Sequence, residues 1–314
     1  MGTAAGVNAL LTQPQIRLPG QALWRRQLPA KGKLCVELGN HVDPDTIVAE
    51  ALRTSPPVVI DIERAQVLVE AGQDVAAGAV IARRRRLLGR GEDIQAPVAG
   101  RVLQCAGDVL LLQPPPLSIR IEAQLPGCVA AIHEGAAIDI EGHFGLITPH
   151  QAVGPSCYGV LGEDIAVAPE PLSGGRLQAF VKQGVRAVVG PSLAGLDQDS
   201  FAPGITCICT EPFPGLAMAA PIATLLRDLK GARAAIQTGR QPVLALALPD
   251  GGNGTQSAFG PGAWVRLANG TTGRLTSIAQ SPRFFESGLR AVPAEVELGD
   301  HTELAPIDSL EWIA

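Results

Sequence analysis

A sixteen-residue pattern occurs twice in the first third of this chain, at residues 34–49 and again at residues 67–82. The two copies share five identical pairs: Val36/Val69, Glu37/Glu70, Gly39/Gly72, Val42/Val75 and Ala49/Ala82. Apolar positions alternate around a glycine turn in both copies, which is the pattern of a bent pair of short strands. Because a repeat commits both copies to the same local structure, it constrains the fold more than any other feature of the sequence.

A second element is also repeated. Residues 95–103 read Gln-Ala-Pro-Val-Ala-Gly-Arg-Val-Leu, and residues 122–130 echo them as Glu-Ala-Gln-Leu-Pro-Gly-Cys-Val-Ala. Each copy is followed by a glycine turn and another apolar strand. We therefore expect residues 1–155 to be an all-β region built from tandem β-hammerhead repeats.

The rest of the chain has a different periodicity. Short amphipathic helices at residues 175–183 and 219–230 alternate with apolar strands at residues 185–189, 205–209 and 243–248, which predicts a small, mostly parallel α/β domain over residues 156–250. Residues 251–314 begin with a Gly- and Asn-rich linker and continue as short strands separated by turns. This spacing suggests an SH3-like barrel, so the predicted fold class is mainly β with a smaller α/β part.

The composition narrows the function classes. The chain has 314 residues, of which 46% are hydrophobic and 18% charged, so it can bury the cores of two or three domains. The formal net charge of -5 excludes a general nucleic-acid-binding surface. No apolar run approaches the roughly 18 to 20 residues of a membrane helix, and the start lacks the pattern of a signal peptide. We expect a cytoplasmic protein without membrane insertion.

The hammerhead pair, followed by Ala96-Pro-Val-Ala-Gly-Arg-Val102, resembles the barrel-sandwich hybrid fold of biotinyl and lipoyl domains. The order of its halves is similar to the circularly permuted form found in membrane-fusion proteins, in subunits of Rnf-type and Na⁺-pumping quinone reductases, and in the large RNA polymerase subunits. A carrier domain needs a lysine at a hairpin tip, because the lysine amine is the atom that is acylated. Asn40-His41 and Gln73-Asp74 stand at the two motif turns instead, so carriage of biotin or lipoate is not expected.

Residues 262–278, Gly-Ala-Trp-Val-Arg-Leu-Ala-Asn-Gly-Thr-Thr-Gly-Arg-Leu-Thr-Ser-Ile, are similar to a KOW motif, a hairpin with which SH3-like barrels contact RNA or protein. From Ala263 onward the chain carries four arginines and seven acidic residues, a balance of 4 − 7 = -3. Phosphate binding needs the opposite sign, so a protein contact is favoured over RNA. The whole arrangement resembles an uncharacterised bacterial family, typical of Chloroflexota, that joins these three parts.

The candidate interaction surface consists of Arg83, Arg84, Arg85, Arg86, Arg90, Trp264, Arg266 and Arg274. The arginine run could bind an acidic partner, phosphate or an anionic surface, or it could be a solvated strand end neutralised by Glu92 and Asp93. A ligand of the α/β domain would lie beyond the strand ends at residues 190–192 and 210–212. No catalytic residue, metal site or cofactor is predicted, because no set of residues has the required spacing.

Three functions remain open. Repeated folding units and the absence of recognisable chemistry favour a non-enzymatic scaffold or adaptor that binds protein partners, including copies of itself. The alternatives are a transcription- or RNA-associated factor of the KOW type, with RNA, DNA or RNA polymerase as its partner, and a subunit of a redox or other enzyme complex.

Overall fold

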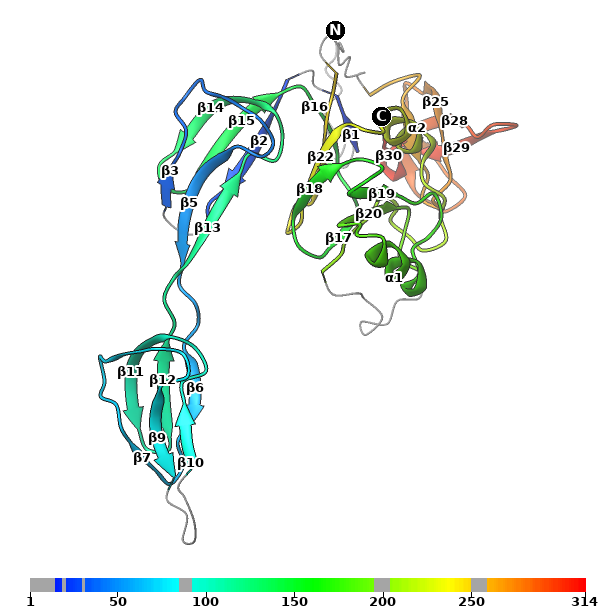
Figure 1. Cartoon of the computed structure of the whole chain (residues 1–314). Coiled ribbons are helices and arrows are strands. Elements are labelled where there is room, and N and C mark those ends of the chain that lie inside the picture. The colour runs from blue at the N-terminus through cyan, green and yellow to red at the C-terminus, as the bar shows by residue number, and fades with distance from the viewer. Residues whose placement is uncertain (1–14, 19–20, 30–31, 85–91, 195–203, 250–258) are drawn as a thin grey trace.

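A computed structural model describes residues 15–18, 21–29, 32–84, 92–194, 204–249 and 259–314 (Figure 1). The chain is mainly β, which confirms the predicted class, and the described residues include two α-helices. Figure 1 shows that one β module, which contains β6 to β12, lies at the end of two extended segments, away from the other parts of the molecule. No helix in the described ranges has the length and apolar character that crossing a bilayer requires.

The outer module consists of two small antiparallel sheets around Trp24, Val48, Leu125 and Ile140. One sheet has the order β2-β15-β14-β4, with bounds Ala22–Gln27, Ala137–Gly142, Gly127–His133 and His41–Val42. The other has the order β13-β5-β3, with bounds Leu117–Glu122, Ile47–Arg53 and Gly32–Leu34.

The inserted module occupies the stretch between β5 and β13 and has a core of its own around Ile60, Ile81, Leu110 and Leu112. Its first sheet has the order β6-β12-β11-β8, with bounds Val58–Asp61, Val109–Gln113, Gly100–Ala106 and Asp74–Val75. Its second sheet has the order β10-β9-β7, with bounds Glu92–Gln95, Val80–Arg84 and Ala65–Val67.

The two repeats make matching hydrogen bonds. Gly39 donates its N–H to the carbonyl of Val129 at 2.8 Å, and Gly72 donates its N–H to the carbonyl of Val102 at 2.7 Å. Both glycines have a positive φ, +84° and +89°, which explains why the turn position is glycine in each copy. The repeats are therefore nested rather than in tandem. The first copy (34–49) pairs with the segment 122–130, whereas the second copy (67–82) pairs with the segment 95–103, which lies inside that outer pair.

Prolines separate the two modules. The β5–β13 ladder ends at the pair Arg53 and Leu117, and the β6–β12 ladder begins at the pair Val58 and Leu112. Pro56-Pro57 and Pro114-Pro115-Pro116 fill the gap, and proline has no N–H with which to continue a ladder. These two proline-containing segments, which we call the neck, hold the inserted module away from the rest of the chain (Figure 1).

The body contains two sheets and both helices. Its antiparallel sheet has the order β1-β16-β23-β22-β18, with bounds Ile16–Arg17, Phe144–Ile147, Val243–Ala247, Arg233–Gln237 and Cys157–Val160. Its second sheet has the order β17-β21-β20-β19, with bounds Gln151–Val153, Thr206–Cys209, Ala187–Gly190 and Ile165–Val167, and β19, β20 and β21 are parallel. Helix α2 (Ala220–Asp228) packs between the sheets, and α1 (Gly174–Lys182) packs on the second sheet.

The antiparallel sheet crosses the predicted boundary at residue 155. We expected residues 243–248 to extend a parallel sheet, but β23 pairs antiparallel with both β22 and β16. The physical reason is the short connection of residues 238–242, which permits only an antiparallel neighbour. The sheet face that carries Leu146, Ala235 and Ala245 packs into the core of the outer module.

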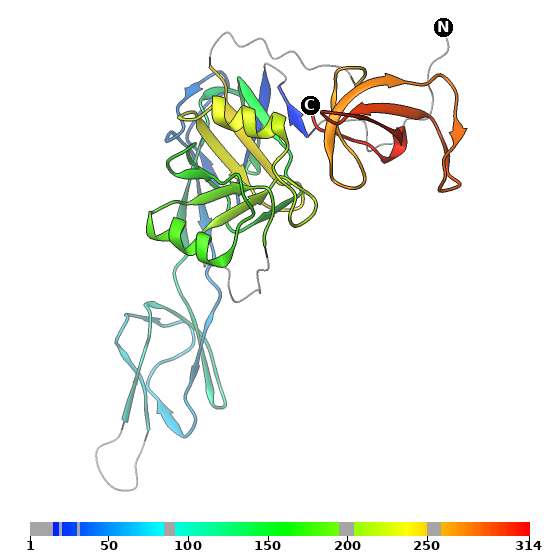
Figure 2. The same cartoon turned by 90° about the vertical axis from the view of Figure 1, so that its right-hand side faces the viewer.

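The C-terminal unit is a five-stranded antiparallel sheet around Val265, Leu275 and Val296. The order of this sheet is β29-β28-β25-β24-β30, with bounds Thr302–Pro306, Pro293–Glu297, Thr272–Ile278, Trp264–Arg266 and Glu311–Trp312. The unit also contains a hairpin of β26 (Arg283–Phe284) and β27 (Arg290–Ala291) and the 3-10 helix Ile307–Ser309. The unit lies to one side of the body (Figure 2). Strand β1 joins the two, because Ile16 donates its N–H to the carbonyl of Ile313 at 2.8 Å.

Candidate functional site

The predicted arginine run begins on strand β9 at the distal end of the inserted module. Arg83 pairs with Asp93 at 2.6 Å, and Arg84 donates to the carbonyl of Glu63 at 3.0 Å. Both contacts stay inside the module, and the pair of Arg83 with Asp93 is one that the solvated, neutralised strand end would contain. Arg85, Arg86 and Arg90 lie outside the described residues.

Of the other predicted surface residues, Arg274 is exposed, Trp264 is half-buried and Arg266 is buried. The guanidinium of Arg274 lies 5.2 Å from the centre of the Trp264 ring, which is a cation–π contact on the C-terminal unit. Arg266, in contrast, is only 2% exposed, so its assignment to a surface is corrected. The cause is the alternation along β24, where Val265 enters the C-terminal core and the two flanking side chains face the body.

Arg266 is the centre of an ion cluster that joins the C-terminal unit to the body. Its guanidinium donates to Glu211 and to Glu311, and it also contacts Gln15 at 3.4 Å. His150 lies 2.9 Å from the other oxygen of Glu311. These contacts and the Arg266 charge lower the pKa of Glu311 below its usual range, although burial acts in the opposite direction.

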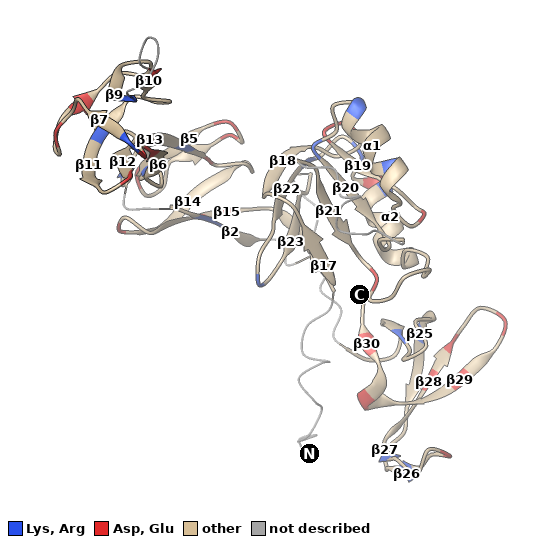
Figure 3. Cartoon of the chain, turned by 90° about the horizontal axis from the view of Figure 1, so that it is seen from below, with Lys and Arg blue, Asp and Glu red and all other residues tan. Residues whose placement is uncertain are grey.

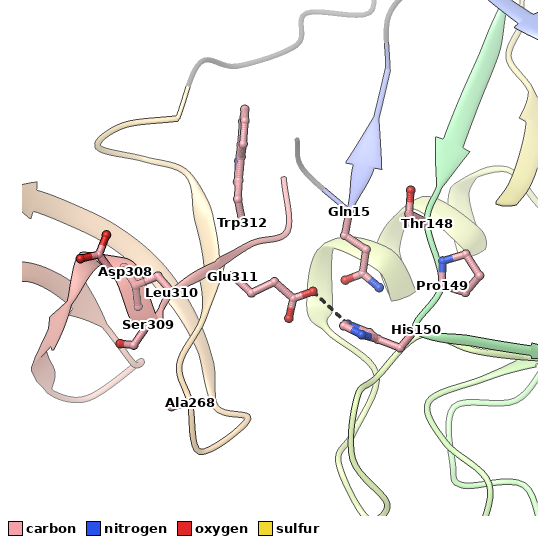
Figure 4. A pocket seen from close by; sticks show the side chains of 10 residues that line it. All are labelled: Gln15, Thr148, Pro149, His150, Ala268, Asp308, Ser309, Leu310, Glu311 and Trp312. Atoms are coloured by element: carbon pink, nitrogen blue, oxygen red, sulfur yellow. Dashed lines mark ion pairs between the residues drawn. The ribbon is translucent and has the colours of Figure 1, made fainter. Parts of the chain in front are cut away.

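A cavity of about 520 Å³ lies beside this cluster. Figure 4 shows Glu311 and His150 meeting from opposite walls, with Gln15 and Thr148 on the body side. Ala268 and the segment 308–312 form the other wall. The cavity therefore lies at the joint between the body and the C-terminal unit.

The contacts of this cluster are those of a structural ion network that stabilises the joint between the C-terminal unit and the body. Glu211 is 1% exposed at its side chain, and its second oxygen accepts hydrogen bonds from Thr210 and from the N–H of Ala219. A guanidinium held by two carboxylates has little capacity left for an external anion. The described part of the chain also contains no group of three His, Cys, Asp or Glu side chains that could hold a metal ion.

At residues 210–212, one of the two strand ends where we expected a ligand, the position is filled by the chain itself. Glu211 follows β21 and is the carboxylate that Arg266 binds, so the C-terminal unit covers this edge of the parallel strands. The sequence predicted a ligand position at residues 210–212, but it did not predict that Arg266 of the same chain binds there. The available signals were an arginine in the apolar strand Trp264-Val-Arg-Leu267 and a glutamate two residues after the predicted apolar strand 205–209.

An apolar patch lies on the inserted module. It consists of Val59, Leu103, Val109 and Leu111, which we call the distal patch. Val59 and Leu111 are direct cross-strand partners, and Leu103 lies in the bulge of β11 opposite Leu111. Val59 is 65% exposed, and the patch spans three adjacent strands of one sheet face.

Exposed apolar residues are concentrated around this module. The large apolar side chains that are exposed between β5 and β13 are Val59, Leu68, Val98, Leu103 and Val109, and Leu52 and Leu117 lie on those two strands themselves. The five between the strands are more than a third of the thirteen in the described chain, although this stretch is about a fifth of the sequence. Val59, Leu103 and Val109 of the distal patch all stay exposed when the described residues are taken together.

No protein-family model matches the sequence, and no curated protein is significantly similar to it.

Proposed function

We propose that this protein is a non-enzymatic adaptor that binds a partner protein through its inserted module. The observation that carries the proposal is the distal patch, an uncovered apolar sheet face on a module held away from the body by a proline-containing neck. Both β modules are proposed to be barrel-sandwich hybrids, and residues 259–314 an SH3-like barrel. We further propose that the chain is cytoplasmic and belongs to the three-part bacterial family that it resembles.

Contiguous apolar surface is the physical basis of the proposal. An isolated exposed leucine or valine needs no explanation, but side chains that adjoin across three strands form a surface that gains free energy when a partner covers it. Protein interfaces combine such an apolar centre with a charged rim. Arg101, exposed on the same strand as Leu103, supplies a rim charge.

The charge distribution favours a protein over RNA as the partner. Acidic residues lie on β28, β29 and β30 of the C-terminal unit (Figure 3), the part that resembles a KOW domain. A surface of this sign repels phosphate.

The proposal is tested by removing the inserted module. Arg53 and Leu117 are paired neighbours at the end of β5 and β13, so residues 54–116 can be replaced by an Asn-Gly turn that closes the two strands into a hairpin. Affinity capture from native cells with quantitative mass spectrometry then compares this deletion with the full chain. We expect at least one protein that the full chain captures to be lost with the deletion.

A pair of point variants separates loss of the patch from loss of the module. Val59→Ser with Val109→Ser removes apolar surface from the distal patch, and Leu38→Ser with Val181→Ser removes a similar amount from exposed positions on the outer module and on α1. The first pair should lose the same partner as the deletion, and the second pair should keep it. Identical captured proteins for the full chain and the deletion would contradict the proposal.

A further inference from the structure

A groove of about 1250 Å³ lies between the outer module and the body. Its floor is the end of the antiparallel sheet of the body, with Arg17, Leu146 and Val243 among its residues. Strand β2 of the outer module forms one wall, and the β22–β23 turn, residues 238–242, forms the other. The segment 148–150 separates this groove from the cavity in Figure 4, because it lines both.

Strand β2 presents an unpaired edge to this groove. It is the last strand of its sheet, and β15 is its only strand partner within the described residues. Leu23, Trp24 and Arg25 all line the groove, although consecutive side chains of a strand point to opposite faces. The edge of the strand, with its free backbone groups, therefore faces the groove.

The groove is positively charged. Arg17, Arg25 and Arg240 line it, and none of its described residues is an aspartate or glutamate. Arg25 is neutralised by Asp139, with two contacts of 2.7 Å. Among the described residues, the buried Nε of Arg17 has no hydrogen-bond partner and the exposed Arg240 has no ion pair. Two guanidinium groups in the groove are thus available to an acceptor that the described chain does not supply.

We propose that this groove binds an extended acidic peptide segment of a partner protein, which adds to β2 as a further strand. The inference rests on the proposed adaptor function and names the chemistry of a second contact with a partner. A strand-edge complex gains affinity from backbone hydrogen bonds and specificity from alternate side chains. Carboxylates at alternate positions of the peptide would pair with Arg17 and Arg240 on the free side of β2.

A peptide fits the groove better than a small anion does. The groove exceeds the roughly 300 to 1,000 Å³ of ordinary small-molecule sites. It also places Leu23, Leu146 and Pro242 among its polar residues, which provides apolar contacts that phosphate or citrate would not use.

The test uses the purified full chain and a fluorescein-labelled eight-residue peptide of alternating glutamate and threonine. Fluorescence anisotropy should show saturable binding that weakens several-fold between about 50 mM and about 300 mM salt, because the contacts are ionic. Arg17→Gln with Arg240→Gln should weaken binding about tenfold or more, since two charge-assisted contacts are lost. Arg240→Gln alone, at an exposed position, gives an intermediate loss that does not depend on the packing of Arg17.

Matched controls make the result specific. Arg233→Gln with Arg290→Gln removes the same charge from exposed strand positions outside the groove and should change the affinity less than about twofold. A peptide with proline in place of each threonine loses half of its backbone N–H donors and has φ fixed near about −65° at those positions, which disfavours pairing with the β2 edge, so it should bind at least about tenfold more weakly.

Three outcomes would overturn the inference: no binding of the acidic peptide, equal loss in both double arginine variants, or equal binding of the proline peptide. Displacement of the peptide by inorganic pyrophosphate at a comparable concentration would instead assign the groove to small anions and would also overturn it. The variant lacking residues 54–116 retains every groove residue and should bind the peptide like the full chain. Failure here therefore leaves the adaptor test on the inserted module unaffected.

Discussion

Asp139 shows how a single buried charge is accommodated in the outer module. Its side chain is 4% exposed, and both oxygens accept hydrogen bonds from Arg25 while one also lies 2.9 Å from His133. Hydrogen bonding to Arg25 is the main cause that lowers the pKa of Asp139 from 3.8 to about 2, against the opposing effect of burial. The carboxylate form is therefore the one that the folded chain stabilises.

Replacing Asp139 with asparagine should destabilise the protein by about 2 kcal/mol at pH 7, because the lowered pKa corresponds to a free energy of that order. A group whose pKa is depressed on folding contributes above its unfolded pKa and loses the contribution as the pH falls through the folded value. The difference between the wild type and Asp139→Asn should thus be constant above about pH 5 and shrink between about pH 4 and pH 2. Urea unfolding across this range measures it, and a difference independent of pH would show that the carboxylate charge is irrelevant.

The burial and the ion-pair partners of Arg266 could not be predicted from the sequence alone. Its neighbours in the cluster are distant in sequence, since Glu211 is 55 residues and Gln15 is 251 residues away. The residue itself was singled out from the sequence, but the pattern Trp-Val-Arg predicts only alternation, not which face the rest of the molecule covers.

Arg266→Met should destabilise the joint between the C-terminal unit and the body by about 3 to 5 kcal/mol, because it leaves the Glu211 carboxylate buried without its partner. The double variant Arg266→Met with Glu211→Leu should lose much less, since no unpaired charge remains. Glu311→Gln should cost about 1 kcal/mol or less, because that side chain is 33% exposed. Thermal unfolding of the four proteins checks this order, and equal losses for the single and double variants would rule out a coupled pair.

Among the elements, the nested repeats show where sequence reasoning succeeds and where it ends. The glycine turns at Gly39 and Gly72 and the strands around them follow from local pattern, and the structure has both. The nesting does not follow, because β5 pairs with the nearby β3 on one edge but with the distant β13 on the other, and the whole inserted module lies between β5 and β13. Pairing over such a separation depends on tertiary packing, which local propensity does not encode.

The inserted module should unfold as a separate unit. Its core cluster contains residues only from Val58 to Leu112, and the core of the outer module contains none of them. Differential scanning calorimetry of the full chain should show a transition that is absent from the variant lacking residues 54–116, while the remaining transition stays within a few degrees. A deletion variant that fails to unfold cooperatively would show that the modules share their stability.

For the whole molecule, the predicted domain boundaries cut through a packed structure. The outer module, the antiparallel sheet and α2 form successive layers, so the first two predicted regions share the core around Phe144 and Ala245. Tyr158 of β18 strengthens this contact by donating to Glu122 at 2.6 Å, and that hydrogen bond adds to burial in raising the pKa of the tyrosine. The part that does project from these layers is the inserted module (Figure 1).

Site-specific photo-crosslinking tests most directly whether that projecting module is the part that meets a partner. A photoreactive phenylalanine analogue is placed at Val59 in the distal patch or, as a matched control, at Val181 on α1, which is 41% exposed. We expect irradiation of native cells to link the Val59 protein, but not the Val181 protein, to one discrete second polypeptide. Crosslinks from Val181 alone, or none from Val59 when the protein is folded and abundant, would contradict the account.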